Sequence, residues 1–348
     1  MRAKKAAVQH KHPSHNVRVI GVVGQYGKTT TARLLAEILR ESGLRVAVFT
    51  NRGSWIENEP YTLAYDGSAD AVQRAIATGR KKADIVIIEI TPALCHTHVL
   101  PTLQLEMSIV TSEGSLMPVV LEQPATYVVV PSAMNPDDLQ AAPHQRISFG
   151  EDSLAEAQIS HVRLMRKGTE VDITLDHHTK HLLSSYLLGG ANVRNVAAAV
   201  AAAYVLGVAV DVLPEGVARV EELPGNMQYL ASEAPYVCMV DAAHTKEACE
   251  YVLEAVRQFA KRRVLVAADN SLDSEAAKYV AEKCDQLTLV DGEEKGNVYT
   301  AKDIHAAAAH TLRGAKKDDF VLFLGTHYAA LDDTGAVVAQ SVLDQAHE

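Results

Sequence analysis

The chain has 348 residues, of which 48% are apolar and 22% are charged. This is ordinary globular usage, which excludes a disordered chain, a collagen-like rod and a single small stapled module, and it gives room for about two domains. The 43 acidic residues outnumber the 33 basic ones, and a net charge of −10 argues against nucleic acid or an anionic membrane as partner and favours a small anion.

Residues 1–16 are basic and polar, and they lack the apolar stretch of a signal peptide. We expect them to form a flexible tail. No later run approaches 18 uninterrupted apolar residues, so no membrane insertion is expected. The four cysteines include no pair spaced as in a zinc knuckle, a pattern that fits the reducing cytoplasm, where we expect the protein to reside.

Residues 17–213 alternate short apolar runs with helical stretches, which predicts a parallel sheet covered by helices on both faces. A left-handed cap at Gly43 is expected to end the first of these helices. The expected strands are 17–23, 44–50, 83–90, 107–111 and 127–131, and the expected helices are 27–42 and 69–81.

The segment 147–188 is more polar and alternates, which predicts a small antiparallel excursion. Asn192 is expected to cap a following helix that is rich in alanine, so this helix should pack close to a neighbouring element, and Gly207 should end it. A short helix and hinge over 211–222 predicts the domain boundary.

Residues 214–348 repeat the alternating pattern on a smaller scale. The expected strands are 236–240, 264–268, 287–290 and 320–324, and the expected helices are 245–261 and 275–283. The predicted fold is therefore α/β, with a parallel-sheet domain over 17–213 followed by a smaller Rossmann-like domain.

The strongest motif is GVVGQYGKTT, residues 21–30, between a predicted strand and a predicted helix. Its glycines, among them Gly24 and Gly27, let backbone N–H groups turn toward a polyphosphate at a helix N-terminus. Lys28 would neutralise the terminal phosphates, and Thr29 offers a hydroxyl to Mg²⁺. Thr30, the last residue of the motif, is also expected to contact the nucleotide. The motif therefore predicts a P-loop that binds a nucleoside triphosphate.

The form G-x-x-G-x-x-G-K-T-T resembles the Mur ligase superfamily, and three later segments strengthen the resemblance. LLGGANVRN, residues 187–195, is similar to the family's Gly-x-x-Asn-x-x-Asn helix. LPGNMQYL, residues 223–230, resembles the start of its C-terminal domain, and VDAAHT, residues 240–245, resembles its Asp-x-Ala-His-Thr segment. The order and spacing agree with the muramyl-tripeptide synthetase branch over about residues 17–330.

The resemblance implies an ATP-dependent ligase that phosphorylates a substrate carboxylate and then lets an amine attack the acyl phosphate. Lys28, Thr29 and Glu89 would serve the phosphoryl transfer, with Thr29 and Glu89 on Mg²⁺. The alternative for Glu89 is an ion-paired strand end.

The resemblance also implies that Asn192 and Asn195 contact the adenine or the phosphates, and that His244, oriented by Asp241, reaches the nucleotide from the second domain. ATP would then lie between the domains, whose closure would protect the acyl phosphate from water. Without the resemblance, Asn192 and Asn195 would be only an N-cap and a polar helix residue. Asp241 and His244 would be a helix cap and a solvated or core histidine.

Several positions depart from the family pattern. Relatives carry a carbamylated lysine after the metal-binding Glu, whereas this chain has no lysine between Lys82 and Lys167. Asn226 stands where relatives have Arg, and Ala93 stands where this branch has a metal-site His, so neither His96 nor His98 carries over by motif. Only 16 residues precede the first predicted strand, so we expect no N-terminal UDP-binding domain.

We therefore predict a Mur-type, ATP-dependent carboxylate–amine ligase linked to peptidoglycan peptide synthesis, with an amino acid or peptide among its small-molecule substrates. One alternative is a catalytically reduced relative that binds ATP and acts as a structural or regulatory partner in cell-wall assembly. The other is an unrelated P-loop ATPase or kinase.

Overall fold

The structure, a computed structural model, describes residues 2–112, 117–134, 145–165, 168–332 and 336–347. It divides into two compact units. The first comprises the chain up to residue 221, apart from segments 165–167 and 187–189, which group with the second unit, and the second continues from residue 222. Each unit has a sheet and a core of its own, so each is described by itself.

In the described residues, the first unit holds an eleven-stranded sheet in the order β11-β10-β9-β8-β7-β6-β1-β5-β2-β3-β4. Its centre, from β2 to β9, is parallel wherever the pairing is described, and β3, β4 and the β10–β11 pair are antiparallel. The strands are β1 (Arg18–Val23), β2 (Val46–Thr50), β3 (Gly53–Ile56), β4 (Glu59–Pro60), β5 (Ile85–Glu89), β6 (Met107–Val110), β7 (Tyr127–Pro131), β8 (Gln145–Gly150), β9 (Ala157–Met165), β10 (Gly168–Leu175) and β11 (Thr179–Ser185).

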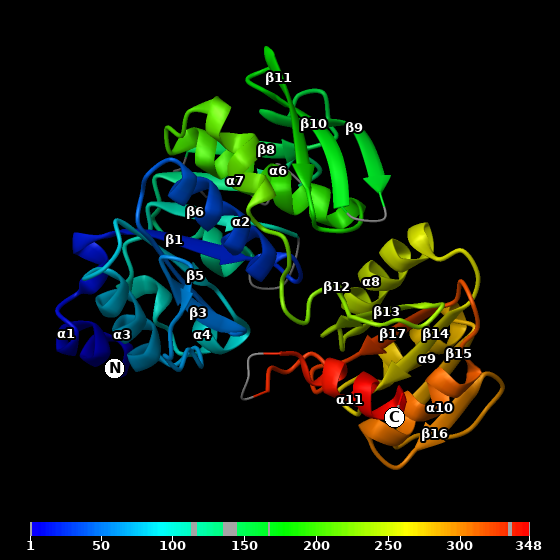
Figure 1. The fold of residues 1–348 in the computed structure, drawn as a ribbon. Helices are drawn as coiled ribbons and strands as arrows, with labels where there is room; N and C mark the ends of the chain where they lie inside the picture. The colour runs from blue at the N-terminus through cyan, green and yellow to red at the C-terminus, as the bar shows by residue number, and fades with distance from the viewer. Residues whose placement is uncertain (1, 113–116, 135–144, 166–167, 333–335, 348) are drawn as a thin grey trace. The chain divides into compact units, whose positions relative to one another are not determined.

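Helices cover both faces of the parallel part of this sheet (Figure 1). On one face, α2 packs against α6 and α7, and on the other α1 packs against α3. The alanines of α6 allow its close contact with α2, as the sequence predicts. The helices are α1 (Arg2–Gln9), α2 (Lys28–Glu41), α3 (Ala69–Gly79), α4 (Pro92–His96), α5 (Met117–Leu121), α6 (Gly190–Val205) and α7 (Leu213–Ala218).

The second unit has, in its described residues, a six-stranded sheet in the order β12-β13-β17-β14-β15-β16, parallel apart from β12. Helices α8 and α9 bury one face, while α10 and α11 bury the other. The elements are β12 (Gln228–Tyr229), β13 (Val237–Asp241), α8 (Lys246–Phe259), β14 (Val264–Ala268), α9 (Ser274–Lys283), β15 (Gln286–Val290), β16 (Val298–Ala301), α10 (Ile304–Gly314), β17 (Phe320–Leu324) and α11 (Val338–His347). The predicted α/β class is confirmed.

Two expectations about the first unit are wrong. The segment taken for a flexible tail contains α1, whose Ala3, Ala6 and Ala7 are buried at helical spacing, and His10 Nε2 lies 2.9 Å from Asp70 Oδ1 on α3. The segment after residue 147 is not purely antiparallel, because β8 and β9 join β7 in parallel and extend the main sheet. Among the described residues, no helix is both long and apolar enough to cross a bilayer.

Candidate functional site

The loop between β1 and α2 has the conformation that its glycines allow. Gly24 has φ 149° and Gly27, which precedes the first residue of α2, has φ 80°, both in the region that other residues rarely adopt. Among the residues that the structure describes, no side chain caps the N-terminus of α2 at Gly27, so this end of the helix presents backbone N–H groups and a partial positive charge to the loop.

Lys28, the first residue of α2, turns its ammonium group back into the loop. Its Nζ donates to the carbonyl oxygens of Gly24 and Gln25 at 2.9 and 3.2 Å and lies 3.8 Å from Glu89 Oε1. The side chain is 16% exposed, so the positive charge is partly withdrawn from water and faces a carboxylate.

Glu89 ends β5, which pairs with β1 such that Val22 lies opposite Glu89. Its side chain is 2% exposed, and its Oε2 accepts a 2.9 Å hydrogen bond from Thr29 Oγ1. A hydroxyl and a carboxylate oxygen therefore meet beside the loop, and such hard oxygen ligands suit Mg²⁺. Thr30, the next residue, is buried in α2.

Three residues that the sequence did not single out complete this cluster. Thr111 and Ser112 follow β6, the other neighbour of β1, and both hydroxyls contact the loop. Tyr65 donates from its hydroxyl to the Glu89 carbonyl oxygen at 3.0 Å. Burial first, and then the negative charge of Glu89, raises the pKa of Tyr65 well above 10, so the phenol stays protonated and remains a donor.

The two asparagines of the α6 helix lie behind the loop. Asn192 does not cap α6, because the helix already begins at Gly190. Asn195 Nδ2 donates to Asn192 Oδ1 at 2.9 Å, and Asn195 Oδ1 accepts from Thr31 Oγ1 at 3.4 Å. A Cβ placed on Gly27 would lie 2.2 Å from Asn195 Oδ1, so the amide supports the loop where only glycine fits.

In the second unit, Asp241 is the last residue of β13, and His244 follows three residues later. Both carboxylate oxygens of Asp241 accept backbone N–H groups, from Met227 at 2.8 Å and from Ala243 at 2.7 Å. His244 is exposed, and its Nδ1 donates to the Ala242 carbonyl at 3.0 Å, which leaves Nε2 for another partner. Thr245, not Asp241, caps α8.

A second buried carboxylate in this unit was also missed. Asp269 follows β14, is 1% exposed and accepts N–H groups from Ser271, His327 and Tyr328. A Cβ on Gly325 would lie 2.2 Å from Asp269 Oδ1, so this glycine permits the close approach. The signal in the sequence was an aspartate at the end of one apolar strand and a Gly-Thr-His turn at the end of another, β17, which pairs with β14 in the sheet.

His96 ends α4 and His98 follows it with φ 52°. Within the described ranges, no group of three or more His, Cys, Asp or Glu side chains is placed to hold a metal ion. The Thr29–Glu89 pair brings only two oxygen donors together, so a metal ion there would need further oxygens from a ligand.

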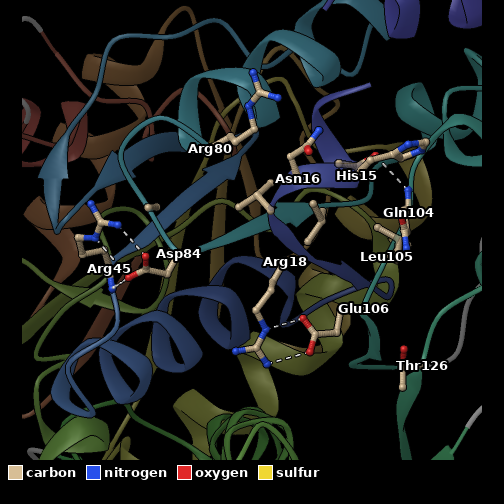
Figure 2. Close-up of a pocket in the computed structure, with 14 residues that line it drawn as sticks. His15, Asn16, Arg18, Arg45, Arg80, Asp84, Gln104, Leu105, Glu106 and Thr126 are labelled. Carbon is tan, nitrogen blue, oxygen red and sulfur yellow. Dashed lines mark hydrogen bonds and ion pairs between the residues drawn. The ribbon is translucent and has the colours of Figure 1, made fainter. Parts of the chain in front are cut away.

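A groove of about 700 Å³ lies at the opposite edge of the first sheet, at the amino ends of its strands (Figure 2). Arg18 pairs with Glu106 through two bonds of 2.6 and 2.8 Å, and Arg45 Nη2 lies 2.7 Å from Asp84 Oδ1. These charges are already paired within the chain. Ligands of parallel sheets bind at the carboxyl ends of the strands, which is the P-loop edge.

Comparison with known proteins identifies the relatives of this chain. The model of the family described as "Mur ligase, glutamate ligase domain" matches residues 225–327. UDP-N-acetylmuramoyl-L-alanyl-D-glutamate–2,6-diaminopimelate ligase of Geobacter sulfurreducens is 26% identical over 76% of this chain and 57% of its own length. The ligase of that name from Halalkalibacterium halodurans is 24% identical over 93% of this chain and 76% of its own. The chain thus spans little more than half of the first relative.

Solved structures show the same fold at low identity. MurF from Acinetobacter baumannii superposes with a TM-score of 0.76 at 16% identity, covering 100% of this chain and 81% of that one. A bifunctional folylpolyglutamate synthase/dihydrofolate synthase with Mn, AMPPNP and L-glutamate bound gives a TM-score of 0.75 at 16% identity, covering 100% and 94%. The chain is therefore a Mur ligase-like protein, as its motifs predict.

Proposed function

We propose that this chain is an ATP-dependent carboxylate–amine ligase of Mur type that forms an amide bond in peptidoglycan peptide synthesis in the cytoplasm. The observation that carries the proposal is the meeting of Lys28, Thr29 and Glu89 at the phosphate-binding loop of a Mur ligase-like fold. The loop supplies N–H donors, a cation and an oxygen pair, which together are what phosphoryl transfer from a nucleotide requires.

The reaction would proceed in two steps. A carboxylate oxygen of the substrate attacks the terminal phosphorus of ATP, the bond to ADP breaks, and an acyl phosphate forms. The amine nitrogen then attacks the carbonyl carbon, phosphate leaves, and the nitrogen loses a proton. Activation is needed because a carboxylate oxygen is a poor leaving group until it is phosphorylated.

In the first step, Lys28 would release the Gly24 and Gln25 carbonyls and donate instead to the terminal phosphate oxygens. The N-terminus of α2 would place its partial positive charge beside the same phosphates. Both contributions grow as negative charge collects on the transferred group, so they favour the transition state over the bound substrate.

The Thr29 hydroxyl and the Glu89 carboxylate fit Mg²⁺, because both are oxygen donors and they already lie 2.9 Å apart. When bound, the ion would neutralise charge on the phosphates. Solved structures of the same fold hold a nucleotide or a divalent ion. A MurF ligase from Thermotoga maritima is in complex with ADP, and a bifunctional folylpolyglutamate synthase/dihydrofolate synthase has AMPPNP and Mn bound.

Further nucleotide contacts are proposed for Asn192, Asn195, Asp241 and His244. The Nε2 atom of His244 could take a nucleotide contact, since the side chain is exposed and Nδ1 is already used. The carboxylate of Asp241 would help to orient this contact, because it accepts the backbone N–H groups of Met227 and Ala243.

The test is ADP release measured with muramyl peptides and free amino acids added singly and together. We expect release to require both a carboxylate and an amine, and we expect Lys28→Ala to lower it by about 100-fold or more, because its ammonium group is lost from the transferred phosphate. Unchanged turnover in Lys28→Ala, or release that needs neither substrate, would overturn the proposal.

A second candidate rests on one observation, the lack of any lysine between Lys82 and Lys167. The resemblance implies a carbamylated lysine in this stretch, so the second candidate is an ATP-binding partner in cell-wall assembly that has lost ligation. Tight ATP binding without substrate-dependent ADP release would select this candidate over the ligase.

A further inference from the structure

We propose that Ser112 is a positioning residue of the phosphate-binding loop, and that its hydroxyl oxygen keeps the N–H groups of Gln25 and Tyr26 aligned for a phosphate oxygen before the nucleotide arrives. This inference rests on the proposed function. It concerns a residue outside the Gly-Lys-Thr motif, two residues beyond the end of β6, the strand that adjoins β1.

The geometry places Ser112 at the loop's own donors. Ser112 Oγ accepts from the backbone N–H of Gln25 at 2.8 Å and from that of Tyr26 at 3.3 Å. Two successive N–H groups therefore converge on one oxygen, which is the arrangement in which backbone amides bind an anion. Neither bond uses the hydroxyl proton of Ser112, which stays available to donate.

Thr111 holds the carbonyl end of the same residue, Tyr26. Its Oγ1 lies 2.5 Å from the Tyr26 carbonyl oxygen and 3.2 Å from that of Val23, and its backbone N–H continues the β1–β6 ladder to Val23 at 2.8 Å. The Tyr26 residue is thus held at both its N–H and its C=O by consecutive hydroxyls. We call Thr111 and Ser112 the hydroxyl clamp.

Gly24 provides independent support for the clamp. A Cβ at this position would lie 2.2 Å from Thr111 Oγ1 and 3.0 Å from both the backbone N and the Oγ of Ser112. Both clamp residues are buried, so neither could move aside into solvent. Gly24 and the two hydroxyls are therefore packed tightly together, and the loop conformation depends on all three residues.

A neutral hydroxyl is a suitable acceptor for the N–H groups of Gln25 and Tyr26 while no nucleotide is bound. It satisfies two N–H groups that would otherwise face a buried site, yet a charged phosphate oxygen makes roughly twice as strong a hydrogen bond. A phosphate can therefore take over the donors from Ser112, whose own proton can then turn toward the ligand. Without Ser112, the loop would have to be ordered at the moment of binding, which lowers affinity.

Ser108 provides a matched control. It lies on β6 four residues earlier and is fully buried, and among the described residues its Oγ has no hydrogen-bond partner. Ser108→Ala likewise removes one buried serine hydroxyl, on β6 itself, without touching the loop. Ser112→Thr keeps the hydroxyl and serves as the conservative variant.

The first measurement is amide hydrogen exchange of the full chain without nucleotide, read at single residues by NMR. We expect Ser112→Ala to speed exchange at Gln25 and Tyr26 by about 10-fold, while Ser108→Ala leaves both amides unchanged. Equal protection at these amides in wild type and Ser112→Ala would overturn the inference whether or not the chain binds ATP.

The second measurement is calorimetric binding of ADP and AMP. We expect Ser112→Ala to raise the Kd for ADP by about 10-fold, with Ser112→Thr within about 3-fold of wild type and AMP binding little changed, because the loop serves the terminal phosphates. A loss that is equal for ADP and AMP, or equal in Ser108→Ala, would show a general structural effect and contradict the inference. Failure of the wild type to bind ADP would count against the proposed function instead.

Discussion

The carboxylate of Glu89 is the negative charge at the centre of the candidate site. It lies 2% exposed between the Thr29 hydroxyl, the Lys28 ammonium and the Tyr65 phenol that holds its backbone carbonyl. A buried charge in this position is tolerated because a cation and hydrogen-bond donors surround it. The same oxygens are the ones that a divalent ion would use.

Glu89→Gln tests the charge while keeping the shape. The amide oxygen can still accept from Thr29, so the fold should be retained, but the negative charge that attracts Mg²⁺ is lost. We expect the Mg²⁺ concentration for half-maximal activity to rise about 10-fold or more, with turnover reduced about 100-fold, in a magnesium titration of ADP release.

Glu106→Gln is the matched control for this measurement. Glu106 is also partly buried and paired with a cation, Arg18, but it lies at the amino end of β6, at the opposite edge of the sheet. Its substitution should leave the magnesium dependence unchanged. A similar shift in both variants would mean that Glu89 acts only through general stability.

Sequence reasoning found the motif residues of this site but not their tertiary partners. Lys28, Thr29 and Glu89 could be identified because a Gly-Lys-Thr loop and a carboxylate at a strand end are local signals. Thr111, Ser112 and Tyr65 could not, because their contacts with the loop and with Glu89 depend on which strands and loops pack together. Asn195 was noted, but its support of Gly27 became visible only in the packing of α6 on α2.

At the scale of elements, strands and helices with strong patterns were predicted well. β7, β14 and β17 agree with the sequence at both ends, and Thr245 marks the start of α8. Each has a continuous apolar run or a capping residue. Helices α1 and α10 were missed because their buried faces are mostly alanine, which gives little periodic contrast with their polar residues.

Helix α7 positions the long α2 helix through a glycine. Gly216 faces the backbone of α2, where an added Cβ would lie 2.6 Å from the Ile38 Cα, and Arg219 Nε donates to Glu41 at 2.9 Å. Because a backbone atom cannot move aside as a flexible side chain can, the contact requires glycine.

Gly216→Ala should therefore force the two helices apart. We expect the free energy of unfolding to fall by about 1–3 kcal/mol in urea denaturation. Gly190→Ala, at the first residue of α6 with no atom within 4 Å of its added Cβ, is the control and should be neutral or slightly stabilising. Equal stabilities of the two variants would refute the close contact.

At the scale of the whole molecule, each unit has its own hydrophobic core, and the cysteines are divided unevenly between them. Cys238, Cys249 and Cys284 are buried in the second unit, while Cys95 in the first is half-buried. Burial raises the pKa of each of the three buried thiols to about 12 and raises that of Cys95 as well. The three thiols therefore report specifically on opening of the second unit, since a buried thiol reacts only when exposed.

An ion pair at the amino edge of the second sheet allows that unit to be weakened selectively. Asp319 has a fully buried side chain and accepts from Arg263 Nη2 at 2.5 Å and from the Lys316 N–H at 2.8 Å. Burial alone would raise the pKa of Asp319, but these hydrogen bonds and the Arg263 charge outweigh it and lower the pKa. The pKa of Asp319 is lower in the folded protein than in the unfolded chain. The ion pair therefore stabilises the second unit fully above about pH 4, and this contribution is lost as the pH falls through the pKa of the folded state.

Arg263→Ala should leave the buried Asp319 carboxylate with too few donors and lower the free energy of unfolding of the second unit by about 2–3 kcal/mol. At pH 8, where the pair is fully charged in the wild type, we expect iodoacetamide to modify Cys238, Cys249 and Cys284 about 30–100-fold faster in the variant, because 1.4 kcal/mol is a factor of ten in the open population. Labelling of Cys95, followed by mass spectrometry in the same samples, should not change. Parallel acceleration at all four thiols would mean instead that the two units open together.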